Sequence, residues 1–254
     1  MNLIYKVLGL EDFLENFRQN TKKSGFNKAS VEFIKSLGIK IEFSGDIPPQ
    51  KGPLLIISRH LTGLDPYVIA GIIKRDDLYF LADIYQTNKG KEISAHMIPI
   101  FYWDKMGFLK RPLISWPGYF AMRLKTGYMN KNEAKKCNEK AILKAQHMLG
   151  KGKAILIFPS GGDNEKRSWK PGLGEIINLT RRQKLKPQIY EVFITGLTEF
   201  SLLRYFVFRI IGFKEKKIKI TCKRYKFDIF KLPKKEAYVV SQMFKSAYYK
   251  EFNR

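Results

Sequence analysis

The sequence predicts one α/β domain, in which a sheet is flanked by helices. Three observations lead to this prediction. The chain has 254 residues, which suits one large domain because chains usually divide into two only beyond ~250–300 residues. Its hydrophobic fraction of 44% is ordinary for a folded globule, which excludes a disordered or fibrous chain. Short apolar runs alternate with segments of helical periodicity, and this is the pattern of an α/β sheet.

The predicted strands are mostly continuous apolar runs. Residues up to about 37 have the apolar spacing of helices, and the alternating segment 39–43 then predicts a strand that ends in turn-forming residues. Uninterrupted apolar runs are typical of strands that are covered on both faces. Such runs occur at 53–58, 78–82, 153–158 and 189–195.

Three helices are expected between these strands. One begins at Asp65, the expected N-cap, because Pro66 follows at the first helical position. A second covers 132–149 and ends at Gly150, and a third follows Pro171. No repeat or low-complexity linker divides the chain. We therefore expect a single domain over 1–254, made of an N-terminal helical segment (1–38), a core that carries the motifs (39–196) and a basic C-terminal extension (197–254).

Basic residues dominate the charge. Lysine and arginine number 47 against 23 acidic residues, a net charge of +24. Such an excess indicates an anionic partner, which could be nucleic acid, an anionic membrane surface or a phosphate-bearing substrate. No nucleic-acid motif accompanies the basic residues, which are spread along the chain, so nucleic acid is not the expected partner.

The compartment is expected to be the cytosol. Cys137 and Cys222 lie far apart and outside metal-binding spacing, so neither a disulfide framework nor a structural zinc site is expected. The first residues become acidic too early for a signal peptide, so none is expected, and no run approaches the ~18 apolar residues of a spanning helix. Two segments that mix aromatic and basic residues, 205–209 and 244–250, could lie at a bilayer interface or pack against the core. Packing is favoured for each alone, whereas the overall charge favours peripheral membrane contact.

The first motif pairs His60 with Asp65 at a strand-to-helix junction. Histidine can take a proton near neutral pH, and a carboxylate on its other ring nitrogen fixes the tautomer. The five-residue separation requires the loop to curl back, for which Gly63 is expected to give the freedom. On spacing alone, the alternative that Asp65 only caps the helix and His60 is a surface residue is slightly favoured, because His and Asp often occur together by chance.

The second motif follows the strand at 153–158. Phe158 and Pro159 precede Ser160, Gly161 and Gly162, and consecutive glycines let backbone N–H groups converge on an anion. Additional cations follow at Lys166, Arg167 and Lys170. The alternative is a plain glycine-rich turn with solvated lysines. Ser160 is not expected to be a hydrolase nucleophile, because Phe158 stands where the nucleophile elbow needs glycine.

Together, the two motifs resemble the glycerolipid acyltransferase family, that of 1-acylglycerol-3-phosphate and lysophospholipid acyltransferases. The resemblance covers roughly residues 39–196 and consists of an H-x4-D-P junction and a later Phe-Pro-x-Gly loop, each after an apolar strand. It implies a central mixed sheet flanked by helices. It also implies transfer of an acyl group from acyl-CoA or acyl carrier protein. These donors are substrates, and no cofactor is expected.

By this resemblance, His60 is the general base and Asp65 orients it, while a lysophospholipid or related lipid supplies the acceptor hydroxyl. The loop at Ser160 to Gly162 and the cations after it would bind the acceptor's phosphate, and Lys131 occupies the region of the family's middle motif. The protein is then expected to be cytoplasmic and peripherally membrane-associated, in phospholipid biosynthesis or remodelling.

The chain departs from the family pattern at several positions. Family members usually have Glu and then Gly-Thr-Arg after Phe-Pro, and Asn before the histidine, whereas this chain has Ser160 and Arg59. These departures affect the expected identity of the acceptor more than the expected type of reaction. They keep open a second hypothesis, a non-catalytic lipid-binding paralogue at the membrane surface.

Overall fold

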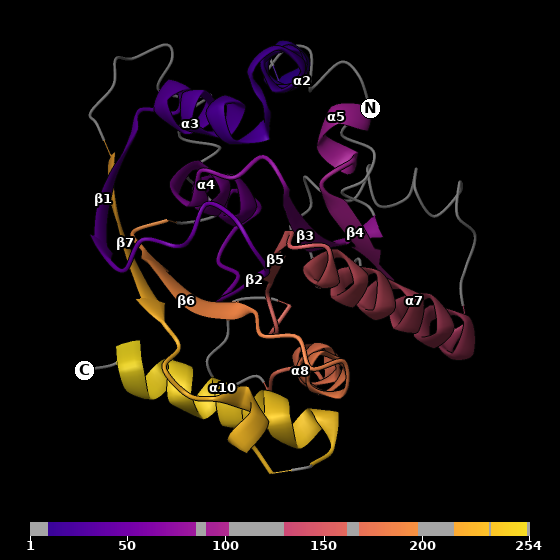
Figure 1. Cartoon of the computed structure of the whole chain (residues 1–254). Coiled ribbons are helices and arrows are strands. Elements are labelled where there is room, and N and C mark those ends of the chain that lie inside the picture. The colour runs from indigo at the N-terminus through magenta and orange to yellow at the C-terminus, as the bar shows by residue number, and fades with distance from the viewer. Residues whose placement is uncertain are drawn as a thin grey trace.

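The computed structural model describes residues 10–84, 90–101, 130–161, 168–197, 216–233 and 235–252. Its centre is a seven-stranded sheet (Figure 1). The strands are β1 (Ile39–Gly45), β2 (Leu54–Ser58), β3 (Leu78–Asp83), β4 (Met97–Ile100), β5 (Ala154–Ile157), β6 (Gln188–Thr195) and β7 (Lys216–Arg224). Their order is β1-β7-β6-β2-β5-β3-β4. Only β6 and β7 pair antiparallel, so the predicted mixed sheet is confirmed.

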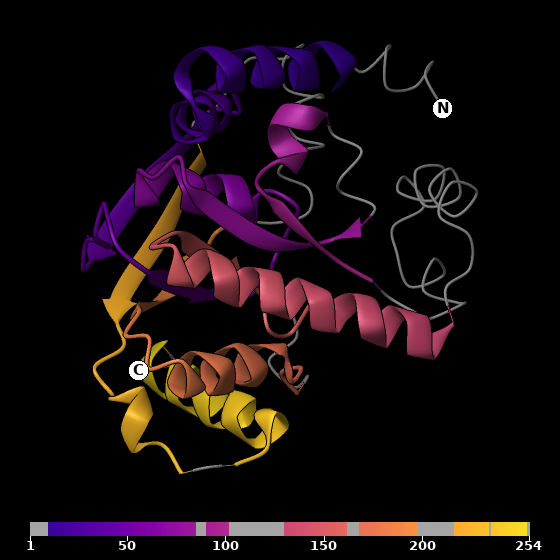
Figure 2. The same cartoon turned by 45° about the vertical axis from the view of Figure 1, so that its right-hand side comes forward.

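Helices cover both faces of the sheet. They are α2 (Leu10–Ser24), α3 (Phe26–Ser36), α4 (Asp65–Ile73), α5 (Lys91–Ser94), α7 (Lys131–Gly150), α8 (Gly172–Arg182) and α10 (Ala237–Phe252), with a short 3-10 helix, η3 (Ile229–Lys231). The first four lie on one side of the sheet, and α7, α8 and α10 lie on the other (Figure 2). No helix in the described ranges is long and apolar enough to cross a bilayer.

The central strand β2 shows why its sequence is apolar throughout. Leu54 and Ile56 belong to the core beneath α3 and α4, whereas Leu55 and Ile57 belong to the core beneath α7, α8 and α10. All five residues of β2 are buried, because a strand with helices on both faces has no solvent-facing side. The same explanation holds for β5, whose four residues are buried.

The C-terminal extension supplies a strand that the sequence reading did not predict. Strand β7 pairs in parallel with β1 and antiparallel with β6, so it lies inside the sheet. Its Ile218, Ile220 and Cys222 are buried while Lys217 and Lys219 are exposed. Part of the predicted basic extension (197–254) is therefore a lysine-rich strand of the same sheet.

Helix α10 contains one of the two segments that mix aromatic and basic residues, 244–250. Phe244 and Tyr248 are fully buried in the core that α8 and α10 share, so the packing interpretation of segment 244–250 is confirmed. Segment 205–209 lies outside the described residues.

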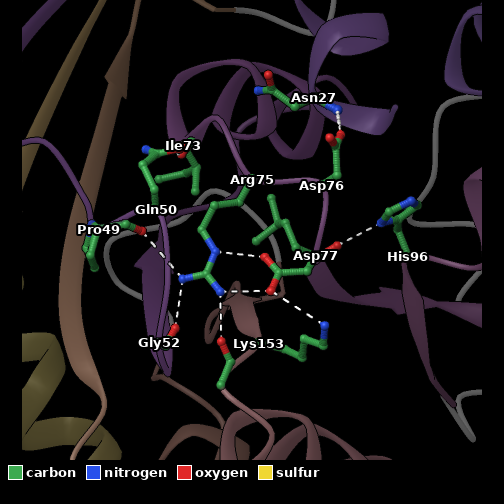
Figure 3. A network of polar contacts seen from close by, with 12 residues as sticks. Asn27, Pro49, Gln50, Gly52, Ile73, Arg75, Asp76, Asp77, His96 and Lys153 are labelled. Carbon is green, nitrogen blue, oxygen red and sulfur yellow. Dashed lines mark hydrogen bonds and ion pairs between the residues drawn. The ribbon is translucent and has the colours of Figure 1, made fainter. Parts of the chain in front are cut away.

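A buried arginine ties together the amino ends of three strands (Figure 3). The Arg75 guanidinium donates to the carbonyls of Gly52 at 2.7 Å and Gly152 at 2.8 Å, just before β2 and β5. It also donates to both carboxylate oxygens of Asp77, just before β3, at 2.7 and 2.9 Å. Partial burial alone would raise the pKa of Asp77, but Arg75 and Lys153 outweigh it and lower that pKa. Charge-assisted bonds of this kind fix the relative positions of the strands.

Candidate active site

Parallel pairing brings the two predicted loops together. β2 and β5 are neighbours with Ile57 opposite Ile157, so the chain leaves both strands at the same edge of the sheet. The ring of His60, from the loop after β2, lies against the ring of Phe158, from the loop after β5. Their centroids are 4.7 Å apart. The H-x4-D and Phe-Pro motifs therefore lie next to each other at one edge of the sheet.

His60 and Asp65 are in direct contact. Nδ1 of His60 lies 2.9 Å from Oδ2 of Asp65. The Asp65 side chain is 0% exposed, whereas that of His60 is 32% exposed. Because an ionised carboxylate only accepts hydrogen bonds, this contact places the ring proton on Nδ1 and the lone pair of neutral imidazole on Nε2. The arrangement suits a histidine that accepts a proton from a bound group.

The Asp65 carboxylate also explains how the loop curls back. Its Oδ2 accepts from the backbone N–H groups of Leu61 at 2.6 Å and Thr62 at 2.8 Å. The hydroxyl of Thr62 lies 3.3 Å from Oδ1 and accepts from the N–H of Leu64 at 3.0 Å. A single buried carboxylate thus organises the loop and orients the histidine ring.

Two expectations about this loop were wrong. The N-cap of α4 is Leu64, not Asp65, because the Asp65 carboxylate turns back toward the loop rather than to the N–H groups of its own helix. Gly63 does not have a positive φ, and a Cβ there would meet open space. The curl depends on hydrogen bonds to the carboxylate and not on glycine's conformational freedom.

The second loop is compact where the structure describes it. Gly161 has a left-handed φ of 64°, a conformation that favours glycine, and its N–H donates to the carbonyl of Phe158 at 3.1 Å. The N–H of Lys170 donates to the carbonyl of Pro159 at 2.9 Å, which joins the two ends of the loop. Ser160 is buried.

The remaining predicted residues are placed as follows. The side chain of Lys170 is exposed at the end of the second loop. Lys131 is exposed at the first position of α7, the helix whose Asn138 exchanges hydrogen bonds with the backbone of Phe101 after β4. Gly162, Lys166 and Arg167 lie outside the described residues.

The site also includes contacts that the sequence reading missed. Arg59 and Tyr248 join the start of the histidine loop to β6 and α10. Tyr248 is 189 residues from Arg59 along the chain, and no local pattern connects them. The only signal was Arg59 itself, an arginine where the family commonly has asparagine.

Comparison with known proteins gives one family match. An acyltransferase family model matches residues 40–194, which is more than half of the chain and includes both loops. The chain belongs to the acyltransferase family. This match confirms the family predicted from the two motifs.

The chain is also similar to a solved structure, that of the 1-acyl-sn-glycerophosphate (LPA) acyltransferase PlsC from Thermotoga maritima. The two chains are 14% identical, and the match covers 93% of this chain and 82% of that chain with a TM-score of 0.49. The comparison with curated proteins finds no match.

Proposed function

We propose that this acyltransferase transfers a fatty acyl group from acyl-CoA or acyl carrier protein to the hydroxyl of a lysophospholipid or related lipid, with His60 as general base. The observation that carries the proposal is the His60–Asp65 pair, at 2.9 Å, beside the second loop. Such a pair deprotonates a hydroxyl near neutral pH. Membership of the acyltransferase family supplies the reaction class.

The proposed reaction has two steps. Nε2 of His60 accepts the proton of the lipid hydroxyl as its oxygen bonds to the thioester carbonyl carbon. The tetrahedral intermediate then expels the thiolate by breaking the carbon–sulfur bond, and the imidazolium returns its proton to the sulfur. The products are an ester and a free thiol. Asp65 stabilises the imidazolium between the two steps, and its complete burial strengthens that interaction.

We further propose that the second loop binds the acceptor's phosphate. The backbone N–H groups of Ser160 and Gly162 would donate to the phosphate, Gly161 would shape the turn through its N–H bond to the carbonyl of Phe158, and Lys166, Arg167 and Lys170 would supply charge. Lys131, at the start of α7, is the remaining residue that we propose to contact the acceptor. The contact between His60 and Phe158 supports this division of roles, because it puts the proposed base next to the loop that would hold the acceptor.

A lipid acceptor implies that the reaction takes place at a membrane surface. We propose that the protein is cytoplasmic and associates peripherally with anionic lipid. The net charge of +24 supports this, since each basic residue near an anionic surface contributes about 1 kcal/mol. Flotation with anionic and with neutral liposomes tests it, and equal flotation with both would contradict it.

Free thiol release tests the reaction. Purified protein is incubated with acyl-CoA or acyl carrier protein thioester and a panel of lysolipids, and thiol is followed by absorbance. His60→Ala should lower the rate about 10²–10⁴-fold, the usual contribution of a general base. His147→Ala, an exposed histidine on α7, is the matched control and should retain the wild-type rate. Equal turnover by His60→Ala would refute the mechanism.

The second candidate is a lipid-binding protein without catalysis. Ser160, where the family usually has glutamate, favours it, because the buried hydroxyl carries no charge. The same experiment separates the candidates. Lysolipid binding by the wild type, with no thiol release from either donor, would favour the binding protein.

A further inference from the structure

The histidine loop, which follows β2 and carries His60, begins where the pairing of β2 with β6 ends. Ser58 is the last residue of β2 to pair with β6, opposite Val192, and His60 follows two residues later. At this point, the carbonyls of β6 need donors other than the backbone of β2. Side chains supply them. The hydroxyl of Ser58 donates to the carbonyl of Val192 at 2.9 Å, and the guanidinium of Arg59 donates to that of Ile194 at 2.8 Å.

Tyr248 reaches the same point from α10. Its side chain is 0% exposed. Its hydroxyl donates to the carbonyl of Val192 at 2.7 Å and accepts from the backbone N–H of Arg59 at 3.3 Å. Burial raises the pKa of Tyr248 far above its usual value, so the hydroxyl keeps the proton it donates. One hydroxyl therefore joins β6 to the residue that precedes His60.

The Arg59 side chain strengthens this connection. Its guanidinium carbon lies 4.1 Å from the centre of the Phe193 ring, within the range of a cation–π interaction. The guanidinium thus lies along β6, while the neighbouring His60 ring lies against Phe158 of the other loop. Of these two successive residues, Arg59 is fixed to β6 and His60 lies against the loop after β5, which defines the direction in which the histidine loop leaves the sheet.

We propose that Tyr248 and Arg59 are positioning residues for acyl transfer, acting by fixing the backbone from which the general base His60 projects. This inference rests on the proposed function. Asp65 holds the far end of the same loop through Leu61 and Thr62, so the pair completes the support at its near end. General-base catalysis is sensitive to such support, because a misplacement of about 1 Å can cost about 100-fold in rate.

Tyr248→Phe is the central test, since it removes the hydroxyl and keeps the buried ring. We expect kcat for thiol release to fall at least about fivefold, the equivalent of one hydrogen bond, while KM changes less than about twofold. Tyr238→Phe, an exposed tyrosine on the same helix, should keep the wild-type kcat. Phe244→Leu, one turn earlier and fully buried, should lower the melting temperature without lowering kcat. Loss of kcat in Phe244→Leu equal to that in Tyr248→Phe would assign the effect to stability and overturn the proposal.

Arg59→Met tests whether the two residues act together. Methionine can still pack on Phe193 but cannot donate to Ile194. Because both residues hold the same backbone position, the double variant with Tyr248→Phe should lose less activity than the product of the two single losses. Multiplicative losses would contradict a shared role.

Hydrogen exchange distinguishes failure of this inference from failure of the proposed function. In Tyr248→Phe, backbone amides of residues 59–62 should exchange at least about fivefold faster, whereas those in α7 should not change. This readout does not need an active enzyme. If wild-type protein releases no thiol, the proposed function fails and the exchange rates alone decide the structural link. If wild type is active, His60→Ala is inactive and Tyr248→Phe keeps full kcat with unchanged exchange, only the positioning role fails.

Discussion

Glu191 predicts the direction in which the free energy of unfolding changes with pH. It lies on β6, is only 3% exposed, and its Oε1 has no hydrogen-bond partner within the described part of the chain. Burial, together with the nearby Glu251, raises the pKa of Glu191 from 4.5 to about 8. Its other titratable neighbours are Tyr225 and Tyr248, and Lys223 is its pairing partner on β7. The carboxyl is therefore neutral in the folded protein at neutral pH.

The raised pKa makes stability depend on pH. Between pH 4.5 and 8 the folded chain keeps a proton that the unfolded chain releases, so the free energy of unfolding falls as the pH rises. The contribution is complete below the unfolded pKa and is lost as the pH passes the folded pKa. At about 1.4 kcal/mol per pH unit, the loss over this interval reaches at most about 5 kcal/mol.

The assay compares wild type with Glu191→Gln, which keeps the size of the side chain but cannot ionise. Urea unfolding at half-unit steps from pH 5 to pH 8.5 gives the free energy of unfolding of each. The glutamine variant should gain on wild type by about 1 kcal/mol per pH unit up to pH 8. Glu236→Gln, an exposed position just before α10, is the control and should follow the wild-type slope. Parallel curves for wild type and Glu191→Gln would show that Glu191 is ionised in the folded protein and would refute the reasoning.

Three further predictions concern the site, the strand clamp and a helix contact. Asp65→Asn should lower kcat about 10²–10⁴-fold in the thiol assay, because an amide in place of the carboxylate no longer fixes the proton on Nδ1 or stabilises the imidazolium. Wild-type kcat would contradict the orienting role. Arg75→Met should lower the free energy of unfolding by about 1–3 kcal/mol, since it leaves the carbonyls of Gly52 and Gly152 without their buried donor and the partly exposed Asp77 without its guanidinium partner. A loss under about 1 kcal/mol in urea unfolding would contradict it. Gly174→Ala should lower the melting temperature markedly, because the added Cβ would lie 1.8 Å from the carbonyl oxygen of Ala237, and an unchanged melting temperature would show that α8 and α10 separate easily.

Five of the seven strands in the sheet could be predicted from the sequence, whereas β7 and β4 could not. β2 and β5 are continuous apolar runs because helices cover both of their faces. β7 alternates buried isoleucines with exposed lysines, a strand pattern that was hidden within a basic segment. Its pairing with β1 joins residues more than a hundred positions apart in the chain, which no local pattern encodes. β4 and α5 have only four residues each and are too short to show a period.

The candidate site divides in the same way. The His60–Asp65 pair and the second loop could be predicted because each follows a strand whose carboxyl end reaches the same edge of the sheet. The N-cap assigned to Asp65 failed because a carboxylate at a helix start has competing donors, and here the loop's N–H groups and the histidine occupy it. Tyr248 was missed because its contact with Arg59 depends on how α10 packs and not on any spacing.

The distribution of burial along the histidine loop fits the proposed role of His60 as general base. Asp65 and Tyr248, which hold its two ends, are completely buried, whereas the His60 ring between them remains partly exposed. A general base needs this combination. If its supports were exposed, water would compete for their hydrogen bonds and the ring would lose its orientation. If the ring itself were buried, a lipid hydroxyl could not reach Nε2. The fold meets both requirements by taking the supports from helices on opposite faces, α4 and α10, and leaving only the ring at the edge of the sheet.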